Sequence, residues 1–310
     1  MSNATSYTVE TLSAMNASEV RTIARKCGMR GAAMLTLSKS ELITRIVTGN
    51  FEAPSVEPPA PVTAAAPVKA GKVHTLEHFN FEKLLRVIAG RVNAALVGPA
   101  GTGKTRSVEN VAKTLGLSFF SQSCSSQTTK SDFFGFIDAT GNYKRSLFRE
   151  AYENGGVFLV DEADAGNANV LTAINAALSN KVCAFPDGMV SKHDNFVCVI
   201  AMNTFGRGAD RMYVGRNQLD AATLNRFAVI SWDYDEKLEL HLASNKDYAK
   251  HVQKIRRAIF ATKERVVAST RNIIEGSKLL EAGFTMEEID DMLIFQHCDE
   301  SLKSKILAGI

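Results

Sequence analysis

Cysteine is scarce in this chain, and none of it is arranged as a metal-binding or disulfide framework. No two cysteines form a C-x-x-C pair, since the five stand at positions 27, 124, 183, 198 and 298. Zinc sites and small disulfide scaffolds need closely spaced cysteines, so this scatter argues against both. We therefore expect free thiols in a reducing cytosol.

Long apolar runs are also absent. No uninterrupted apolar stretch is long enough to span a bilayer, and Met1–Glu10 is polar, without the charged-then-apolar order of a secretory signal. These features predict a protein without membrane contact. The composition, 45% hydrophobic and 22% charged, is typical of globular proteins, and 310 residues allow one to three domains.

A large excess of one charge is missing, but the small excess is localised. The net charge is +3. Residues 1–50 contain three acidic residues and six basic ones, namely Arg21, Arg25, Lys26, Arg30, Lys39 and Arg45. This difference equals the net charge of the whole chain, so the other 260 residues are balanced. The N-terminal segment is therefore the part suited to an acidic partner.

Residues 9–48 predict two short helices in that segment. The first runs from Glu19 to Cys27 after a capping Ser18, and the second begins at Ser38 or Ser40. The string Leu37–Ile43 looks like the second helix of SAP and Rho-N modules, which bind nucleic acid. We therefore predict that residues 1–50 contact DNA or RNA phosphates without reading sequence. A small helical adaptor with a solvated basic face is the alternative.

The rest of the chain predicts a linker, an α/β core and a helical end. Residues 51–72 hold five of the seven prolines, as expected for a semi-rigid linker. In residues 73–235, helical patterns alternate with apolar runs at 94–97, 117–121, 157–160, 197–202 and 228–232, which favours a parallel sheet covered on both faces. Residues 236–310 have only helical patterns, including amphipathic stretches at 249–260, 272–282 and 287–296.

A phosphate-binding loop stands at the start of this core. Residues 98–105 read G-x-x-x-x-G-K-T between an apolar strand and a predicted helix from Ser107 to Leu115. Glycines let backbone N–H groups approach a phosphate, and the helix N-terminus adds positive potential. Lys104 reaches the outer phosphates, and the Thr105 hydroxyl is a Mg²⁺ ligand. The expected ATP-binding residues are Gly98, Pro99, Ala100, Gly101, Thr102, Gly103, Lys104, Thr105 and Arg106.

Two further apolar runs end in polar side chains. Val157–Val160 is followed by Asp161 and Glu162, a Walker B pattern in which the aspartate holds Mg²⁺ and the glutamate polarises the attacking water. The run that ends at Met202 is followed by Asn203. Strand ends of a parallel sheet converge on one edge, so Asn203 is expected to bond the γ-phosphate or the water.

Together these motifs resemble the AAA+ ATPases over residues 75–285. The order continues with Leu224-Asn225-Arg226-Phe227 and Ser269-Thr270-Arg271. The chain is most similar to the MoxR class, especially the ATPase subunit of aerobic cobaltochelatase (CobS), in the stretches 161–166, 203–208 and 213–215. The resemblance implies that Asn203 is sensor 1, Arg271 the sensor 2 arginine, and Arg226 an arginine finger that acts on ATP of the neighbouring subunit. That family usually has Asp where this chain has Asn225, so a carboxylate that orients the finger is missing.

The resemblance implies a homo-oligomeric ring or spiral, most simply a hexamer, that hydrolyses Mg-ATP to remodel a protein or protein–nucleic acid partner. Such ATPases commonly work with a protein carrying a von Willebrand A domain. Alternatives are a cobaltochelatase motor subunit, a DNA- or RNA-stimulated motor, and a nucleotide-gated scaffold with little turnover. The N-terminal module joined to such a core also resembles phage proteins, which implies a bacterial cytoplasm, either the protein's own or that of a host.

Two hairpins are expected as insertions in the core. The first covers Ile137–Ser146 and turns at Gly141-Asn142, and the second covers Val182–Phe196 with a turn near Pro186–Gly188. The resemblance implies that the first lines a central pore. Its residues Tyr143, Lys144 and Arg145 either touch a substrate there or are ordinary hairpin surface.

Overall fold

The computed structural model describes residues 8–15, 17–27, 39–48, 76–209 and 212–310. The chain divides into two compact units, Met1–Val68 and Lys69–Ile310. The predicted linker, residues 51–72, lies outside the described residues. In the part of the chain that is described, no helix has the length and apolarity needed to cross a membrane. All five cysteines are free.

The second unit is built on a five-stranded parallel sheet, as the alternating pattern predicts. Its strand order is β2-β5-β8-β1-β9, and all four pairings are parallel. The strands are β1 (Ala94–Val97), β2 (Phe119–Ser123), β5 (Gly156–Asp161), β8 (Phe196–Met202) and β9 (Ala228–Ser231). Strand β2 begins and ends two residues later than the sequence predicts, and the ends of the other four strands shift by one residue at most.

Each inner strand is apolar on both faces because helices cover both sides of the sheet. In β5, Val157 and Leu159 pack with α5 (Phe81–Ala89) and α6 (Lys104–Thr114). Phe158 and Val160 point the other way, into a second cluster. Burying every residue of a strand in this way explains the continuous apolar runs in the sequence.

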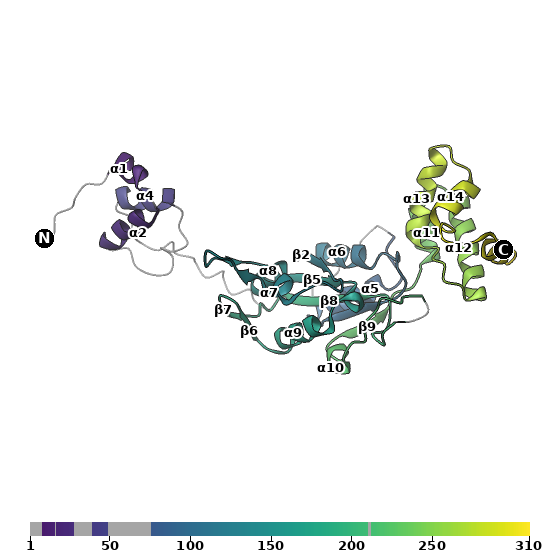
Figure 1. Ribbon diagram of the computed structural model, residues 1–310, viewed down its shortest axis with the longest axis horizontal. Helices are drawn as coiled ribbons and strands as arrows, with labels where there is room; N and C mark the ends of the chain where they lie inside the picture. The colour runs from purple at the N-terminus through teal and green to yellow at the C-terminus, as the bar shows by residue number, and fades with distance from the viewer. Residues whose placement is uncertain (1–7, 16, 28–38, 49–75, 210–211) are drawn as a thin grey trace. The chain divides into compact units, whose positions relative to one another are not determined.

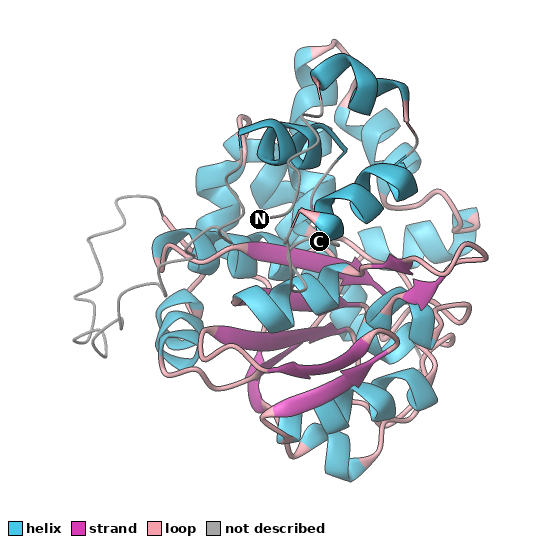
Figure 2. Ribbon diagram, turned by 90° about the vertical axis from the view of Figure 1, so that its left-hand side faces the viewer, coloured by secondary structure: helices cyan, strands magenta, loops and turns pink. Residues whose placement is uncertain are grey.

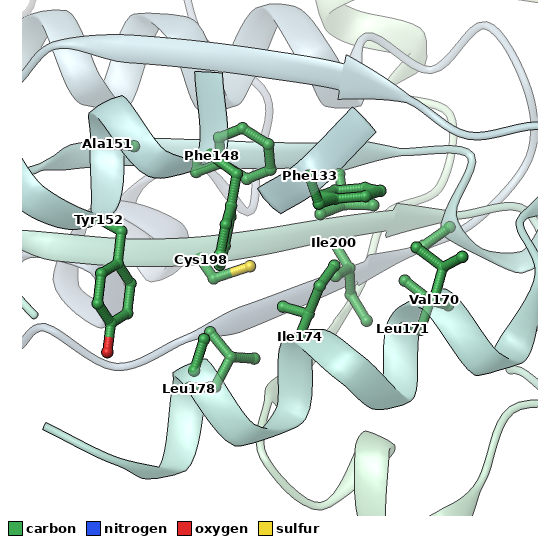
Figure 3. Packing of buried hydrophobic residues seen from close by; sticks show 14 of the residues in the cluster. Phe133, Phe148, Ala151, Tyr152, Val170, Leu171, Ile174, Leu178, Cys198 and Ile200 are labelled. Atoms are coloured by element: carbon green, nitrogen blue, oxygen red, sulfur yellow. The ribbon is translucent and has the colours of Figure 1, made fainter. Parts of the chain in front are cut away.

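The second cluster packs three helices on the opposite face of the sheet. They are α7 (Lys130–Phe134), α8 (Leu147–Asn154) and α9 (Ala168–Ser179). Figure 3 shows Val170, Leu171 and Ile174 of α9 facing Ile200 of β8, with aromatic side chains of α7 and α8 beside them. Figure 2 shows helices on both sides of the strands, so the sheet lies at the centre of this unit.

Both predicted hairpins are present. Strands β3 (Phe136–Ile137) and β4 (Tyr143–Lys144) pair antiparallel around a turn that contains Gly141. Strands β6 (Val182–Phe185) and β7 (Gly188–Ser191) pair with Phe185 opposite Gly188, so the turn is Pro186-Asp187. The second hairpin ends before Phe196, which already belongs to β8.

Beyond β9 the chain is helical, as predicted. The one-turn helix α10 (Ala221–Leu224) precedes this strand, and five helices follow it: α11 (Glu236–Leu242), α12 (Lys246–Thr262), α13 (Thr270–Glu281), α14 (Met286–Leu293) and α15 (Glu300–Leu307). They lie together in Figure 1 and share one apolar core. Within it, a buried ion pair joins Arg256 to Glu239 at 2.6 Å, and the Thr270 hydroxyl donates to the same carboxylate at 2.7 Å. The start of α13, next to Arg271, is therefore fixed to α11 and α12.

The first unit contains three described helices rather than the predicted two. They are α1 (Val9–Ala14), α2 (Ala17–Lys26) and α4 (Lys39–Thr48). The first was missed because it has only six residues, yet a Thr8 capping box begins it and Leu12 is buried. Leu42, Ile43 and Ile46 are the buried residues of α4 in the apolar cluster of this unit. Helix α2 begins at Ala17, so the predicted cap Ser18 lies inside the helix, and the predicted start at Ser38 lies outside the described residues.

Candidate functional site

The loop 98–103 connects β1 to α6 at the carboxyl edge of the sheet. A Cβ at Gly98 would collide with the backbone carbonyl of Trp232, so the loop passes another strand where only glycine fits. Gly101 and Gly103 have φ values of 75° and 79°, which glycine adopts without strain. Helix α6 begins at Lys104, three residues before the predicted start, so its N-terminal N–H groups lie in the loop itself.

Lys104 lies at the centre of the site. Its ammonium donates to the carbonyls of Gly98 and Pro99 at 2.7 and 2.8 Å and to Oδ1 of Asn203 at 3.1 Å. Burial lowers the pKa of Lys104 to about 8, although Asp161 raises it in part. The structure thus brings together the lysine and the sensor 1 candidate, 99 positions apart in sequence.

Thr105 and Asp161 meet across the same edge. The Thr105 hydroxyl donates to Oδ2 of Asp161 at 2.5 Å. A hydroxyl and a carboxylate oxygen in contact are the hard ligands that Mg²⁺ prefers, so these residues fit the ion that the sequence predicts. The sequence-based pairing of these two residues therefore agrees with their positions.

Glu162 follows Asp161 with an unusual backbone. Its φ is 51°, in the left-handed region that side-chain-bearing residues rarely adopt, and its N–H donates to Oδ1 of Asp161 at 2.9 Å. Strained backbone of this kind gathers at functional sites. Half of the Glu162 side chain is exposed, and Arg216 lies 3.4 Å from its Oε2.

Asp164 joins the turn after Glu162 to the end of β8. Its side chain is fully buried, and Oδ2 accepts hydrogen bonds from the N–H groups of Asn203 and Thr204 and from the Thr204 hydroxyl, at 2.8 to 3.1 Å. A buried carboxylate with this many donors is costly to displace. It therefore holds the backbone of Asn203 beside Lys104.

Arg271 and Arg106 border a hollow next to the phosphate-binding loop. A cavity of about 680 Å³ is lined by Leu76–His78, by residues of the loop, and by α11 and α13, including Arg271. Ser269, at the cap of α13, lies so close that a Cβ on Gly101 would touch it. Arg106 is exposed and lies 3.8 Å from Glu109. The structure thus places Arg271 near the loop, and Arg106 at the rim.

Two tyrosines contact the loop at Ala100. The Tyr213 hydroxyl accepts a hydrogen bond from the Ala100 N–H at 2.9 Å, and the Tyr234 hydroxyl donates to the Ala100 carbonyl at 3.0 Å. The Arg256 guanidinium lies 3.8 Å from the centre of the Tyr234 ring. The loop is therefore connected to the buried ion pair of the C-terminal helices.

Arg226 lies apart from these residues. It follows α10, its Nε donates to the Ser179 hydroxyl at 2.7 Å, and its Nη1 donates to the carbonyl of Ala222. Among its hydrogen bonds in the described part of the chain, none reaches the phosphate-binding loop. The structure thus brings the loop, Asp161, Glu162, Asn203 and Arg271 to one region but leaves Arg226 on another surface.

Sequence reasoning missed Asp164, Arg216 and the two tyrosines. Asp164 lies two residues after Glu162 of the Walker B motif, and the sequence does not show that its side chain is buried. Arg216 directly follows Gly215, at the end of a string that was noted only for its resemblance. Tyr213 and Arg216 lie in a loop whose residues have no fixed spacing from the strands, so no periodic signal indicates them.

Comparison with known proteins found one matching family model, several curated relatives and several solved structures. Residues 93–227 match the family model described as AAA domain (dynein-related subfamily). Midasin of Dictyostelium discoideum is 27% identical over 73% of this chain and 4% of midasin, and CbbQ of Hydrogenophilus thermoluteolus is 26% identical over 49% of this chain and 57% of CbbQ. Among solved structures, NtrX from Brucella abortus matches with a TM-score of 0.48 and 15% sequence identity. The match covers 69% of this chain and 52% of the NtrX chain.

The chain spans a small fraction of midasin and little more than half of CbbQ. The resemblance to AAA+ ATPases is confirmed, while the narrower likeness to CobS and the SAP-like module stay predictions. Residues 93–227 are thus similar to an AAA domain, and the α/β fold with its five-stranded parallel sheet is consistent with a P-loop AAA+ core with a helical C-terminal part.

Proposed function

We propose that the protein binds and hydrolyses Mg-ATP. The observation that carries the proposal is the meeting of Lys104 with Asn203, and of Thr105 with Asp161, at the carboxyl edge of the sheet. A cationic side chain, a helix N-terminus and oxygen ligands for Mg²⁺ within one site suit a nucleoside triphosphate. Glu162, adjacent to these groups, supplies a base for water.

Each residue has a distinct role in this reaction. Lys104 neutralises the outer phosphates, and Asn203 bonds the γ-phosphate or the water through its amide. Glu162 accepts the proton of the water as the water attacks phosphorus. Mg²⁺, held by Thr105 and Asp161, would neutralise charge on the phosphate oxygens. Arg271 approaches from α13, where the Thr270–Glu239 bond fixes the start of the helix.

The assembly we propose is a ring or spiral of identical subunits, most simply a hexamer. This proposal rests on Arg226. Because Arg226 lies away from the phosphate-binding loop of its own chain, it acts as an arginine finger only on ATP bound by a neighbouring subunit. The resemblance to MoxR and CobS proteins favours remodelling of a protein or protein–nucleic acid complex, with a von Willebrand A domain partner. A cobaltochelatase motor subunit is the competing function of the same core.

Replacing Lys104 by alanine should weaken ATP binding at least about 10- to 100-fold, because the charge that faces the outer phosphates is lost. Titration with a fluorescent ATP analogue measures this. Since the ammonium of the free protein loses its proton at a pKa of about 8, ATP affinity should also fall as the pH rises through that value.

The matched control is Lys83→Ala, an exposed lysine on α5, which should bind ATP like the unmodified protein. Unchanged ATP affinity in Lys104→Ala would refute the phosphate-binding role of the loop, and with it the proposed function.

We also propose that the first unit binds DNA or RNA, on the strength of the positive charge in residues 1–50. Deleting residues 1–68 should weaken nucleic-acid binding and leave ATP hydrolysis intact. Because at most six basic side chains contribute, the logarithm of the affinity should fall with the logarithm of salt with a slope no steeper than about 5. Equal binding by both forms at low salt would instead favour a protein adaptor.

A further inference from the structure

A loop arginine without a role in the proposed reaction lies against the Glu162 carboxylate. A single nitrogen of Arg216, Nη1, lies 3.4 Å from Oε2 of Glu162 and 3.3 Å from Oδ1 of Asp164. Only 13% of the Arg216 side chain is exposed, so water screens these pairs less than ion pairs on an open surface. The guanidinium thus links the proposed base to a second carboxylate in the same turn.

Asp164 is the fixed end of this link. Its side chain is fully buried, and its other oxygen accepts three hydrogen bonds from Asn203 and Thr204. Glu162 is the adjustable end, since half of its side chain is exposed. Within the described residues its only ion pair is the one with Arg216. The orientation of Glu162 therefore depends on where Arg216 stands.

The segment that carries Arg216 is itself attached to the site on two sides. The N–H of Asn217 donates to the carbonyl of Asp164 at 2.7 Å, and its side-chain amide donates to the carbonyl of Gly166 at 2.8 Å. On the other side, Tyr213 bonds Ala100 of the phosphate-binding loop, and the Arg216 guanidinium lies 5.9 Å from the centre of the Tyr213 ring. These contacts leave the arginine little freedom to move away.

We propose that Arg216 is a positioning residue for ATP hydrolysis: it holds the Glu162 carboxylate where it accepts the proton of the attacking water. Through Asp164, it also ties that orientation to the strand end that carries Asn203. The inference rests on the proposed function. A guanidinium suits the task because its Nη1 carries two N–H donors, one for each carboxylate, and because it keeps its charge at any physiological pH.

The competing role for Arg216 is a direct contact with the outer phosphate of ATP. Its positive charge is near enough to Lys104 to lower the pKa of that ammonium, so the two cations share one region of the site. The two roles differ in what they affect. A phosphate contact changes the affinity for ATP relative to ADP, whereas positioning of Glu162 changes the rate of hydrolysis only while Glu162 is present.

A double-mutant cycle separates these roles. Arg216→Ala is made in the unmodified chain and in Glu162→Gln, and single-turnover hydrolysis of radiolabelled ATP is measured together with affinity for ATP and ADP. In the unmodified chain, Arg216→Ala should slow hydrolysis by about 10- to 100-fold, the effect of losing a hydrogen bond to a charged group. In the Glu162→Gln background it should change the residual rate less than about 2-fold, because there is no base left to orient.

Two further variants guard the result. Arg216→Lys should recover part of the rate, because a cation returns beside Glu162. Arg86→Ala, which removes an exposed ion pair with Glu82 on α5, should hydrolyse ATP normally. Thermal unfolding of each variant reports whether the fold is kept.

The outcomes are distinct. Equal rate losses in both backgrounds, or no recovery with lysine in a folded variant, would overturn the positioning role, and a selective loss of ATP over ADP affinity would assign Arg216 to the phosphate instead. If the unmodified chain hydrolyses no ATP, both the proposed function and this inference fall. If it does, and Glu162→Gln slows it while Arg216→Ala does not, only the inference fails.

Discussion

Glu162→Gln should reduce ATP hydrolysis by about 10²- to 10⁴-fold and leave ATP binding intact. Glutamine has nearly the shape of glutamate, but its amide cannot take the proton that the attacking water must lose. The neighbouring ligands are kept, since Thr105 and Asp161 contact each other without Glu162. Phosphate release at saturating ATP measures the rate, and titration with a labelled ATP analogue measures the binding.

The control for this substitution is Glu82→Gln, the same chemical change at an exposed position on α5, which should have no effect on the rate. Hydrolysis within a few-fold of the unmodified protein in Glu162→Gln would show that another group is the base. Because Glu162→Gln should keep ATP bound, it also serves as a trap to identify the partner, since an arrested complex holds its substrate long enough for isolation.

The sequence predicts the sheet well because each strand carries its own signal. Strands covered on both faces must be apolar throughout, so runs such as Val157–Val160 stand out without any knowledge of their neighbours. Strand β2 is displaced from its predicted position because its last three residues are polar, so no apolar pattern marks its end, and Leu117 belongs to the preceding loop. Helix α1 is too short for a periodic pattern, and its evidence, a capping box and one buried leucine, becomes visible only in the structure.

The residues of the candidate site also fall into two groups, those whose place the sequence predicts and those whose place it does not. Lys104, Thr105, Asp161 and Asn203 could be predicted because each occupies a fixed place at the end of a strand or the start of a helix, and parallel strands bring those places together. Arg216 could not, because it reaches the site from a loop whose path depends on contacts such as that between Asn217 and Asp164. The roles assigned to all of these residues, and those of Arg226 and Arg271, stay predictions.

Arg226→Ala should keep ATP binding and lose hydrolysis by about 10³- to 10⁵-fold, the range for an arginine that stabilises the transition state of phosphoryl transfer. The MoxR and CobS proteins that this chain resembles usually have an aspartate before this arginine, whereas this chain has Asn225. Arg226 donates hydrogen bonds to the hydroxyl of Ser179 and the carbonyl of Ala222. These contacts hold the guanidinium at a surface away from the phosphate-binding loop of the same chain. Arg257→Ala, which removes an exposed arginine of α12, is the control and should hydrolyse ATP normally.

A mixing experiment decides whether Arg226 acts between subunits. Arg226→Ala and Lys104→Ala are each expected to be inactive alone, the first without its finger and the second without ATP. In a mixed assembly, some interfaces combine the intact loop of an Arg226→Ala subunit with the intact Arg226 of a Lys104→Ala subunit. Those interfaces should hydrolyse ATP, and the recovered activity should rise with protein concentration because assembly is required. An Arg226 that acts within its own chain cannot be rescued in this way, since every intact loop then sits in a chain that lacks the arginine. Mixed assemblies that form, as shown by co-purification of two differently tagged variants, yet recover no activity would exclude the finger between subunits and remove the reason for a ring.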